Sequence, residues 1–539
     1  MLAAALAVCA AAAVLRRARI PTPVVLVVAG VVVSFTPVVP DVLIEPKVVL
    51  LGLLPVLVFH AAYASSPRAM AAEGHTIAML AVGLVVVTAV AAAVVAHLAV
   101  GLSWPLSFVL GTAIGPTDAA APASIASGLG LPSRLVTIIE GESLLNDTTA
   151  LVLYATAVDW AVSGRPLHLA TLGLLLYSAV SAAAIGLAVG ALGHAARRRL
   201  DDPPVEVVLK LLLAYTAYLP AEAIGASGVL AAVVAGLYLG WHDPESATAR
   251  ARLQASVFFD ALVFMIEAVL FTEVGLSLHA FAKNHDDAHP WRLLVAGAAL
   301  AGCVVVVRIG WVLLATRIPG PLRRMVATAP SAGGQRGERH LLAWAGMRGA
   351  ITLAAALAVP TLDDQGKVLA GRTDLVYLAF AVIFATLVGQ GLTLPALARR
   401  IASHVPAQLP TDEREARAEL ARVALERLDR DIASCGLAPV VTGELRSELE
   451  KRIHRIEQFG GNGEGEVDEL ELERCVRLDL LGAQRHRLLQ LRSDQRVSAA
   501  TMRELQHELD LEETRLSPRG NDRSRTREAS RREPAARRG

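Results

Sequence analysis

Apolar segments long enough to cross a lipid bilayer recur throughout residues 1–402. A hydrocarbon core about 30 Å thick needs roughly 20 apolar residues in a helix, and a helix satisfies its backbone hydrogen bonds internally. The sequence therefore predicts an all-α polytopic membrane protein with about 13 transmembrane helices. Twelve is the alternative, because the first segment is short and the eighth nearly joins the ninth. The expected spans are 2–15, 21–39, 47–65, 75–100, 104–128, 134–161, 167–195, 205–222, 226–241, 253–279, 291–316, 341–360 and 374–400.

Charged residues divide the chain into two parts. Residues 1–402 contain 49 Lys, Arg, Asp and Glu residues, whereas residues 403–539 contain 52. We therefore predict a transmembrane domain at 1–402 and a cytoplasmic helical region at 403–516. A solvated helical bundle is the simpler interpretation of that region, and a pH sensor is the alternative. Residues 517–539 are rich in Arg, Ser and Pro, which is typical of a disordered basic tail that can contact anionic lipid.

Other features exclude several classes of protein. The basic residues are scattered, so nothing indicates nucleic-acid binding. The four cysteines form no Cys-x-x-Cys pair, which argues against a disulfide framework or a cysteine metal site. Arg16, Arg17 and Arg19 follow the first apolar segment instead of preceding it, so we interpret that segment as a span and not as a cleaved signal peptide.

The basic residues between the spans predict the orientation. With the N-terminus outside, the inner connections hold 17 Lys and Arg residues and the outer connections hold six. Basic residues favour the cytoplasmic side of a membrane. We therefore expect a multi-pass protein of the cell membrane whose C-terminal region is cytoplasmic.

Several ionisable residues fall inside the expected spans. Each costs at least about 2.5–3.5 kcal/mol at the bilayer centre, so such residues normally face the bundle interior and serve ions or protons. The acids outnumber Arg308 and Arg348, the basic residues that cannot easily reach water. The surplus acids must therefore be protonated, solvated or bound to cations. The acids are Asp118, Glu140, Glu142, Asp147, Asp260, Glu267 and Glu273.

The densest polar cluster is the sequence Glu-Gly-Glu-Ser-Leu-Leu-Asn-Asp at residues 140–147. Positions four apart share a helix face, which places Ser143 near Asp147 and Glu142 near Asn146. We expect these oxygen ligands to converge on one side of the helix and to bind a small, hard cation. A polar helix face packed against another helix is the alternative.

Two spans contain sequences that favour a break in the helix. Gly-Pro-Thr-Asp at 115–118 removes a backbone donor and loosens the helix, and broken helices provide the midplane ion sites of transporters. Asp118 either caps the next half-helix or carries the ion. Gly-Met-Arg-Gly at 346–349 favours a second break. Arg348 can neutralise Glu142 or Asp118 there, or reach the cytoplasm from the inner end of its span.

Together these motifs resemble the NhaP/NHE branch of sodium/proton exchangers in the cation–proton antiporter superfamily. The resemblance covers about residues 17–402 and is most specific at residues 140–147. The motifs that carry it are Phe-His-Ala-Ala-Tyr at 59–63, Thr-Asp at 117–118, Glu-Gly-Glu-Ser-Leu-Leu-Asn-Asp at 140–147, Ser-Gly-Val-Leu at 227–230, Val-Gly-Leu at 274–276, Gly-Met-Arg-Gly-Ala at 346–350 and Gln-Gly-Leu-Thr-Leu-Pro at 390–395.

The resemblance implies a secondary transporter that exchanges sodium or lithium for protons. Asp147 would bind the cation and the proton in turn, with Ser143 and Thr117 as further sodium ligands. Asn146 occupies a position that holds aspartate in electrogenic relatives, which implies electroneutral exchange. Glu142 and Asp118 would complete or support the site.

The resemblance also implies an architecture. Arg348 would bridge the two broken, crossing helices, and inverted repeats would cover spans 2–7 and 8–13. An ion-carrying core would slide against a scaffold in a homodimer. No cofactor is implied besides the transported ions.

Two positions depart from the family pattern. Ala119 stands where proline often follows Thr-Asp, which changes the stiffness of the break. Glu267 stands where relatives commonly carry an uncharged amide. A buried pair with Arg308 is the simplest interpretation of Glu267, and a second proton-linked carboxylate is the alternative.

Three rival functions follow from the same residues. A potassium/proton antiporter would share the fold, because the motifs do not resolve ion size. An ion channel or sensor would need a symmetric pore and a filter, and the sequence shows no repeat that would build them. An intramembrane metallohydrolase would need histidine ligands, and none lies near residues 140–147.

Overall fold

The computed structural model describes residues 21–35, 47–129, 131–164, 169–200, 202–246, 249–283, 290–314 and 336–402, together with short stretches between 418 and 513. The chain separates into two compact units, 1–405 and 406–539. The expected first span at 2–15 and the expected basic tail at 517–539 lie outside the described residues.

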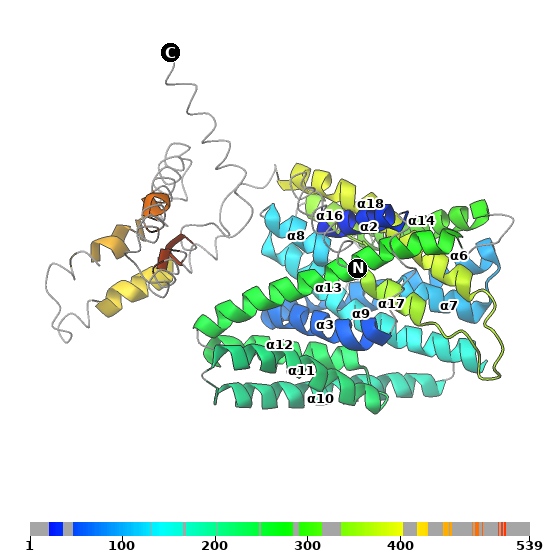
Figure 1. Ribbon diagram of the computed structural model, residues 1–539, viewed down its shortest axis with the longest axis horizontal. Helices are drawn as coiled ribbons and strands as arrows, with labels where there is room; N and C mark the ends of the chain where they lie inside the picture. The colour runs from blue at the N-terminus through cyan, green and yellow to red at the C-terminus, as the bar shows by residue number, and fades with distance from the viewer. Residues whose placement is uncertain are drawn as a thin grey trace, which may run out of the picture. The chain divides into compact units, whose positions relative to one another are not determined.

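The described part of the first unit is built from helices that coincide with twelve of the expected spans (Figure 1). Two of these spans begin with other helical segments. The π-helical η2 (Val48–Leu53) leads into α3 (Leu54–Ala64), and α5 (Gly74–Ala78) and η3 (Met79–Leu84) lead into α6 (Val85–Val100). The short α4 (Pro67–Ala72) precedes α5. The remaining unbroken helices are α2 (Thr22–Ser34), α9 (Ser133–Ser163), α10 (Leu169–Arg197), α11 (Pro203–Ala223), α12 (Gly228–Ser246), α13 (Ala249–Lys283), α14 (Pro290–Leu314) and α18 (Arg372–Ala402).

Six helices of the described residues are long and apolar enough to cross a membrane. They are Gly74–Val100, Leu176–Arg197, Pro203–Ala223, Arg252–Leu276, Trp291–Leu313 and Arg372–Ile401. Further apolar helices are shorter, at Thr22–Ser34, Val48–Ala64, Trp104–Ala113 and Gly228–His242. The chain is therefore a membrane protein of helical spans, and the total of thirteen stays a prediction.

Two of the expected spans are broken in the middle, as their glycines and proline predict. α7 (Trp104–Ala113) and α8 (Ala120–Gly128) are separated by residues 114–119. α16 (Arg336–Trp344) and α17 (Ala350–Ala358) are separated by residues 345–349. These two non-helical stretches touch, because the backbone N–H of Asp118 donates to the carbonyl of Met347 at 2.8 Å.

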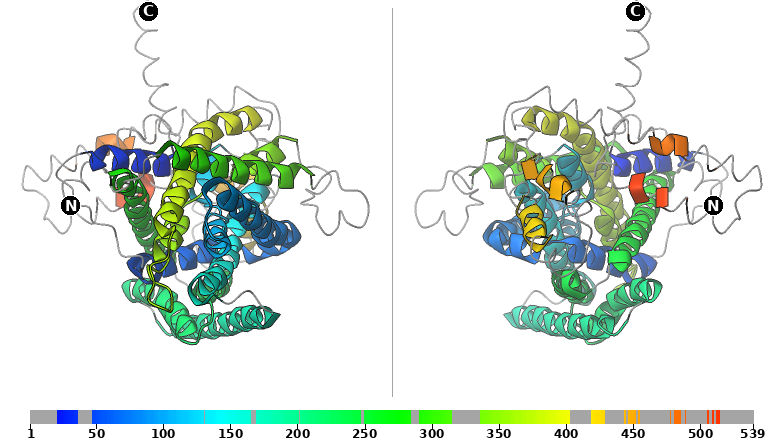
Figure 2. Two further views of the ribbon diagram at one scale, coloured as in Figure 1. Left: turned by 90° about the vertical axis from the view of Figure 1, so that its right-hand side faces the viewer. Right: turned by 90° about the vertical axis from the view of Figure 1, so that its left-hand side faces the viewer.

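The helices pack as two bundles (Figures 1 and 2). In the first, α2 packs along α13, α3 along α12, and α10 and α11 on α12; we call this the scaffold bundle. In the second, α6, α7, α9, α14 and α18 pack with one another and with the half-helices α8, α16 and α17; we call this the core bundle. The bundles meet where α13 contacts α17 and α18, where α3 contacts α9, and where α18 contacts α2.

Glycines permit the closest helix contacts inside the scaffold bundle. A Cβ added at Gly275 of α13 would collide with the Val27 carbonyl and the Val31 amide of α2. One added at Gly240 of α12 would collide with the backbone of Tyr63 in α3. Small residues let membrane helices approach until their backbones touch, which maximises van der Waals contact. The scaffold bundle is therefore held by tight backbone packing.

Candidate functional site

Asp118 lies where the two breaks cross. Its Oδ1 accepts the backbone N–H of Ala120 at 2.8 Å, so it caps the N-terminus of α8. A Cβ at Gly349 would collide with the Asp118 carboxylate, so glycine is required at this position of the facing stretch 345–349. Asp118 therefore orders the first break, which was one of its two predicted roles.

Arg348 satisfies the carbonyls that the two breaks leave open. The residue is 1% exposed. Its Nε donates to the carbonyl of Ile114 at 3.0 Å, and its Nη1 donates to the carbonyl of Gly346. It thus bridges the broken helices, as the resemblance implies. Among the described residues no hydrogen bond or ion pair joins it to Glu142 or Asp118, so its predicted balancing of one of them stays a prediction. Its burial rules out an arginine that reaches water.

The partner of Glu142 is Arg308. Both guanidinium Nη atoms donate to the Glu142 carboxylate, Nη2 to Oε2 at 2.9 Å, and Nε donates to the Leu342 carbonyl at 3.1 Å. Both side chains are almost fully buried. The predicted pair between Arg308 and Glu267 is therefore wrong. Arg308 belongs to α14 of the core bundle, and adjacent spans in sequence need not bring their charges together.

A chain of hydrogen bonds extends from this ion pair to Asn146. The Thr117 hydroxyl donates to Glu142 Oε1 at 3.1 Å, and Asn146 Nδ2 donates to the Thr117 hydroxyl at 2.8 Å. Asn146 Oδ1 has no donor among the described residues. Glu142 and Asn146 thus lie on a face of α9 that packs into the core bundle.

The polar side chains of residues 140–147 were predicted to converge on one side of α9, and this prediction is wrong. Successive residues of a helix are 100° apart, because a turn holds 3.6 residues. Glu142 and Asn146 form one stripe, whereas Glu140, Ser143 and Asp147 form another. The second stripe faces a cavity.

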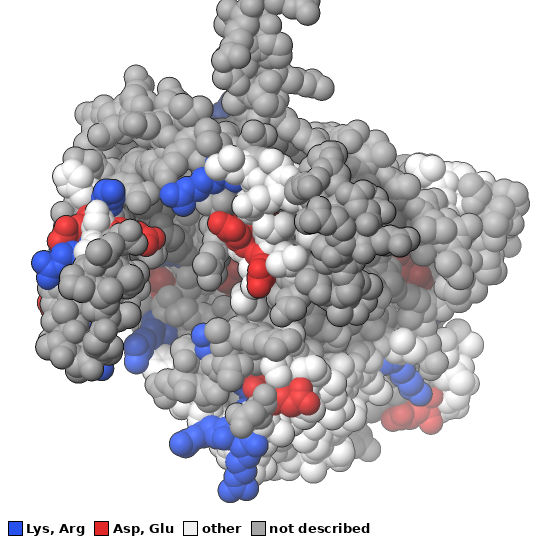
Figure 3. Space-filling view, turned by 60° about the vertical axis from the view of Figure 1, so that its left-hand side comes forward, with Lys and Arg blue, Asp and Glu red and all other residues white. Residues whose placement is uncertain are grey.

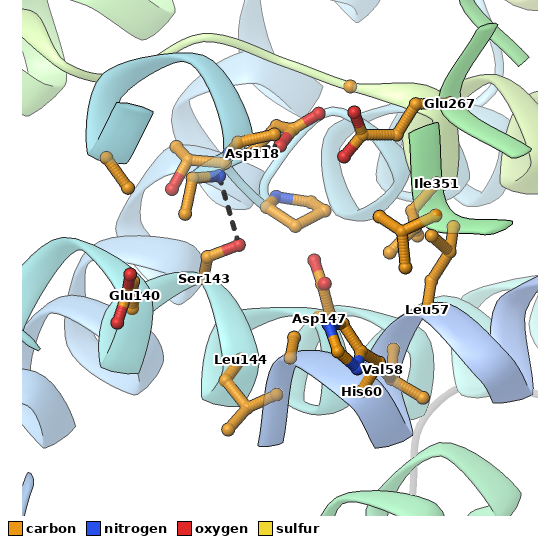
Figure 4. A pocket seen from close by; sticks show the side chains of 18 of the residues that line it. Leu57, Val58, His60, Asp118, Glu140, Ser143, Leu144, Asp147, Glu267 and Ile351 are labelled. Carbon is orange, nitrogen blue, oxygen red and sulfur yellow. Dashed lines mark hydrogen bonds between the residues drawn. The ribbon is translucent and has the colours of Figure 1, made fainter. Parts of the chain in front are cut away.

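The cavity lies between the two bundles and has a volume of about 530 Å³. Asp147 is 8% exposed and points into it (Figure 4). Within the described chain, Asp147 forms no hydrogen bond or ion pair. The Ser143 hydroxyl, which accepts the Ala119 N–H at 3.2 Å, also faces the cavity. The core-side lining consists of Pro116, Thr117, Asp118, Ala119, Ala120, Ala123, Glu140, Ser143, Leu144, Asp147, Gly349, Ile351 and Thr352.

The scaffold bundle supplies the facing wall. Glu267 and Asp260 come from α13 and His60 from α3, together with Leu57, Val58, Ala61, Ala64, Ser65, Val263, Leu270 and Phe271. His60 Nε2 lies 4.0 Å from Asp260 Oδ1, and the imidazole stacks on Phe259 with ring centroids 5.2 Å apart. The Asp260 side chain is 75% exposed, which marks it as the mouth of the cavity. Figure 3 shows that both acidic and basic side chains lie on the face of the molecule that this view brings forward.

The predicted site residues therefore divide into two groups. Asp147, Ser143, Thr117, Asp118 and Glu267 line the cavity. The others, Glu142, Asn146, Arg308 and Arg348, form the buried network behind it. The predicted site omitted Glu140, Asp260 and His60, which also line the cavity. The signal for Glu140 was present, because it lies seven residues before Asp147 and hence two turns away on the same face.

The lining has one chemical property in common, a surplus of acids. Five carboxyl groups and one imidazole face the cavity, and the arginines nearby are bonded elsewhere. Ionised carboxylates in an apolar setting require a proton or a cation. Among the described residues no three His, Cys, Asp or Glu side chains are arranged to hold a metal ion. The carboxyl groups of the cavity therefore need protons or cations to balance them.

The chain is similar to known proteins over most of its length. The profile of the family described as "Sodium/hydrogen exchanger, transmembrane" matches residues 3–400. An uncharacterized Na(+)/H(+) exchanger of Mycobacterium tuberculosis is 35% identical over 506 residues, covering 93% of this chain and 92% of that protein. The uncharacterized Na(+)/H(+) exchanger YjcE of Escherichia coli is 30% identical, covering 92% and 94%. The solved sodium proton antiporter MjNhaP1 of Methanocaldococcus jannaschii has a TM-score of 0.60 at 17% identity, covering 75% of this chain and 97% of its own.

Proposed function

Because this chain belongs to the sodium/hydrogen exchanger family, we propose that it exchanges sodium or lithium for protons, one for one, across a cell membrane. The observation that carries the proposal is Asp147, a buried carboxyl group without a partner that points into a cavity between two bundles. A structural carboxylate at this depth would be paired, as Glu142 is.

The exchange follows from competition at Asp147. An ionised carboxylate inside a low-dielectric bundle is costly unless something neutralises it. A proton does so by binding covalently, and a cation does so by coordination, so each expels the other. The core bundle moves the site past the scaffold bundle only when Asp147 carries a proton or a cation, because the site is then neutral. Coupling then needs no gate that senses both ions.

The sodium ligands that we propose are Asp147, Ser143 and Thr117. The Ser143 hydroxyl accepts one backbone hydrogen bond and retains a lone pair for the cation. Asp118 supports the site by fixing the break beside it. Glu142, Asn146, Arg308 and Arg348 hold this frame without touching the cavity.

Electroneutral exchange is supported by the chemistry beside Asp147. Asn146 is uncharged and is held by Thr117, and the charge of Glu142 is matched by Arg308. The pair of charges behind the cavity adds nothing to the net charge that moves. Asn146→Asp should therefore make transport electrogenic, which a current on a supported membrane would reveal; a silent membrane would count against the stoichiometry.

We also propose the orientation and assembly that the sequence predicts. The cavity mouth then faces the cytoplasm, because α9 and α13 begin on the inner side. A homodimer would form through the scaffold bundle, where α10 exposes Leu176, Val180, Leu187 and Leu192. Such a surface suits lipid or a second copy of the chain.

Proteoliposomes test the proposed function. The purified protein is reconstituted into the liposome membrane with a fluorescent pH indicator in the lumen, and each alkali cation is added outside in turn. Sodium and lithium should drive proton movement without an added ionophore, because one-for-one exchange needs no counter-current. A response to potassium alone would favour the potassium/proton antiporter, and movement that requires an ionophore would favour a channel.

A further inference from the structure

Two pairs of carboxyl groups face each other across the cavity. On α9 of the core bundle the pair is Glu140 and Asp147, and on α13 of the scaffold bundle it is Asp260 and Glu267. The members of each pair are seven residues apart, which is two helical turns or about 10.5 Å. Each pair therefore forms an acidic stripe, with one group near the mouth and one deep in the cavity.

Glu267 is the deep group on the scaffold side. It is partly buried, and it forms no hydrogen bond or ion pair with any residue that the structure describes. In Figure 4 its carboxyl group enters the cavity from the side opposite Asp147. Like Asp147, it faces the cavity without a described partner, whereas the structural carboxylate Glu142 is paired with Arg308.

No basic group is placed to neutralise Glu267 among the described residues. His60 of α3 is directed to Asp260, and Lys210 of α11 donates to the Tyr63 hydroxyl at 2.7 Å. Arg308 and Arg348 are bonded inside the core bundle. The charged or titratable groups that share the cavity with Glu267 are the acids Asp118, Glu140, Asp147 and Asp260, and His60.

Glu267 also belongs to a different body from Asp147. Its helix packs along α2 and against α11 and has fewer neighbours in the core bundle. Gly275, two turns further along α13, lies so close to α2 that a Cβ would collide with the backbone there. Glu267 is therefore fixed to the scaffold, whereas Asp118 and Asp147 are fixed to the core.

We propose that Glu267 is a second ion-exchanging carboxylate of the transport site, which binds a proton or the cation together with Asp147 while the cavity is open. When the core bundle moves, Glu267 stays behind with the scaffold. It therefore takes up and returns its proton on one side of the membrane. This inference rests on the proposed exchange of a cation for a proton.

The proposal separates affinity from stoichiometry. Protons compete with the cation at both carboxylates on the cavity side, so acidification raises the apparent KM for sodium there with a dependence on more than one proton. When the core bundle has moved and the site opens to the other side of the membrane, Glu267 no longer belongs to the site. Because its proton never crosses, the number of protons exchanged per cation is independent of Glu267.

The test compares Glu267→Gln with the unaltered protein in inside-out and right-side-out membrane vesicles. On the cavity side, the apparent KM for sodium should rise about fivefold or more, and its pH dependence should approach that of a single proton. On the other side KM should change less than about twofold. Glu267→Asp, which keeps a carboxyl group, should restore the steep pH dependence.

Three results would overturn the inference. They are an unchanged KM and pH profile on both sides, an equal change on both sides, or an altered number of protons exchanged per sodium ion. If Glu267→Gln does not fold, Glu267→Asp alone decides, because a shorter carboxylate should shift KM on the cavity side only. Failure of the unaltered protein to exchange sodium for protons would instead refute the proposed function.

Discussion

The two polar faces of α9 are built from similar side chains and are treated differently by the fold. Glu142 and Asn146 on one face are bonded through Thr117 and Arg308 into a buried network. Asp147 on the other face is also buried, but it borders the cavity, and no described residue forms a hydrogen bond or ion pair with it. A buried carboxylate that is paired with its counter-charge therefore holds helices together, whereas one without a described partner is available to an ion.

The largest difference between the faces should appear in transport. Asp147→Asn removes the group that exchanges ions but leaves no charge unpaired, so sodium-driven proton flux in proteoliposomes should fall to background while the melting temperature stays near that of the parent. Asp159→Asn is the matched control, because Asp159 is exposed at the far end of the same helix. Retained flux in Asp147→Asn, or lost flux in the control, would remove the functional distinction.

The bonded face should show its importance in stability. Arg308→Met leaves Glu142 buried without its counter-charge, which should cost about 3–5 kcal/mol of folding free energy. Thermal unfolding in detergent, followed by size-exclusion chromatography, measures the loss. Adding Glu142→Leu to the same chain should recover part of it, since an apolar pair leaves no uncompensated charge. Arg308→Met with parental stability would show that the pair is not a structural element.

A smaller loss of stability is expected at the crossing of the two breaks, beside the cavity. Gly349→Ala places a methyl group against the Asp118 carboxylate, which should cost about 1–3 kcal/mol through displaced backbone. Sodium should bind more weakly, because Asp118 and Thr117 are on the same short stretch. Gly389→Ala on α18 is the control, since no atom lies within 4 Å of its added Cβ. Equal effects of the two substitutions would argue against the close crossing of the breaks.

The smallest effect should come from the mouth of the cavity. The Asp260 side chain is 75% exposed, and water and salt screen such a charge. Asp260→Asn should change the apparent KM for sodium by less than about twofold, and the change should shrink as ionic strength rises. Kinetics at low and high choline chloride measure this. Loss of transport in Asp260→Asn would place an essential ion ligand at the mouth.

Sequence reasoning predicted those features that depend on local chemistry. The helices follow from apolar segments of membrane length, and the breaks at 114–119 and 345–349 follow from their glycines and from Pro116. For the helices and the breaks, the cause lies within a few residues of the effect. Asp147 was one of seven acids in the expected spans, and only the resemblance singled it out as the ion carrier.

The pairings within the site were not predictable in the same way. The partner of Arg308 depends on which bundle each helix joins, and nothing in the sequence of α14 distinguishes Glu142 from Glu267. The direction of Glu142 and Asn146 was misjudged because two helix faces were treated as one. His60 and Asp260 were left out of the predicted site, because they meet across α3 and α13 and are 200 residues apart in the chain.

The central claim is that a proton and a cation compete for Asp147. Proton release from purified protein tests it most directly, because no vesicle, orientation or gradient is involved. Sodium chloride added to the protein in weakly buffered detergent should acidify the solution, while choline chloride should not. We expect this release from the parent chain and from Asp159→Asn, and none from Asp147→Asn. Release of equal size from Asp147→Asn would contradict it.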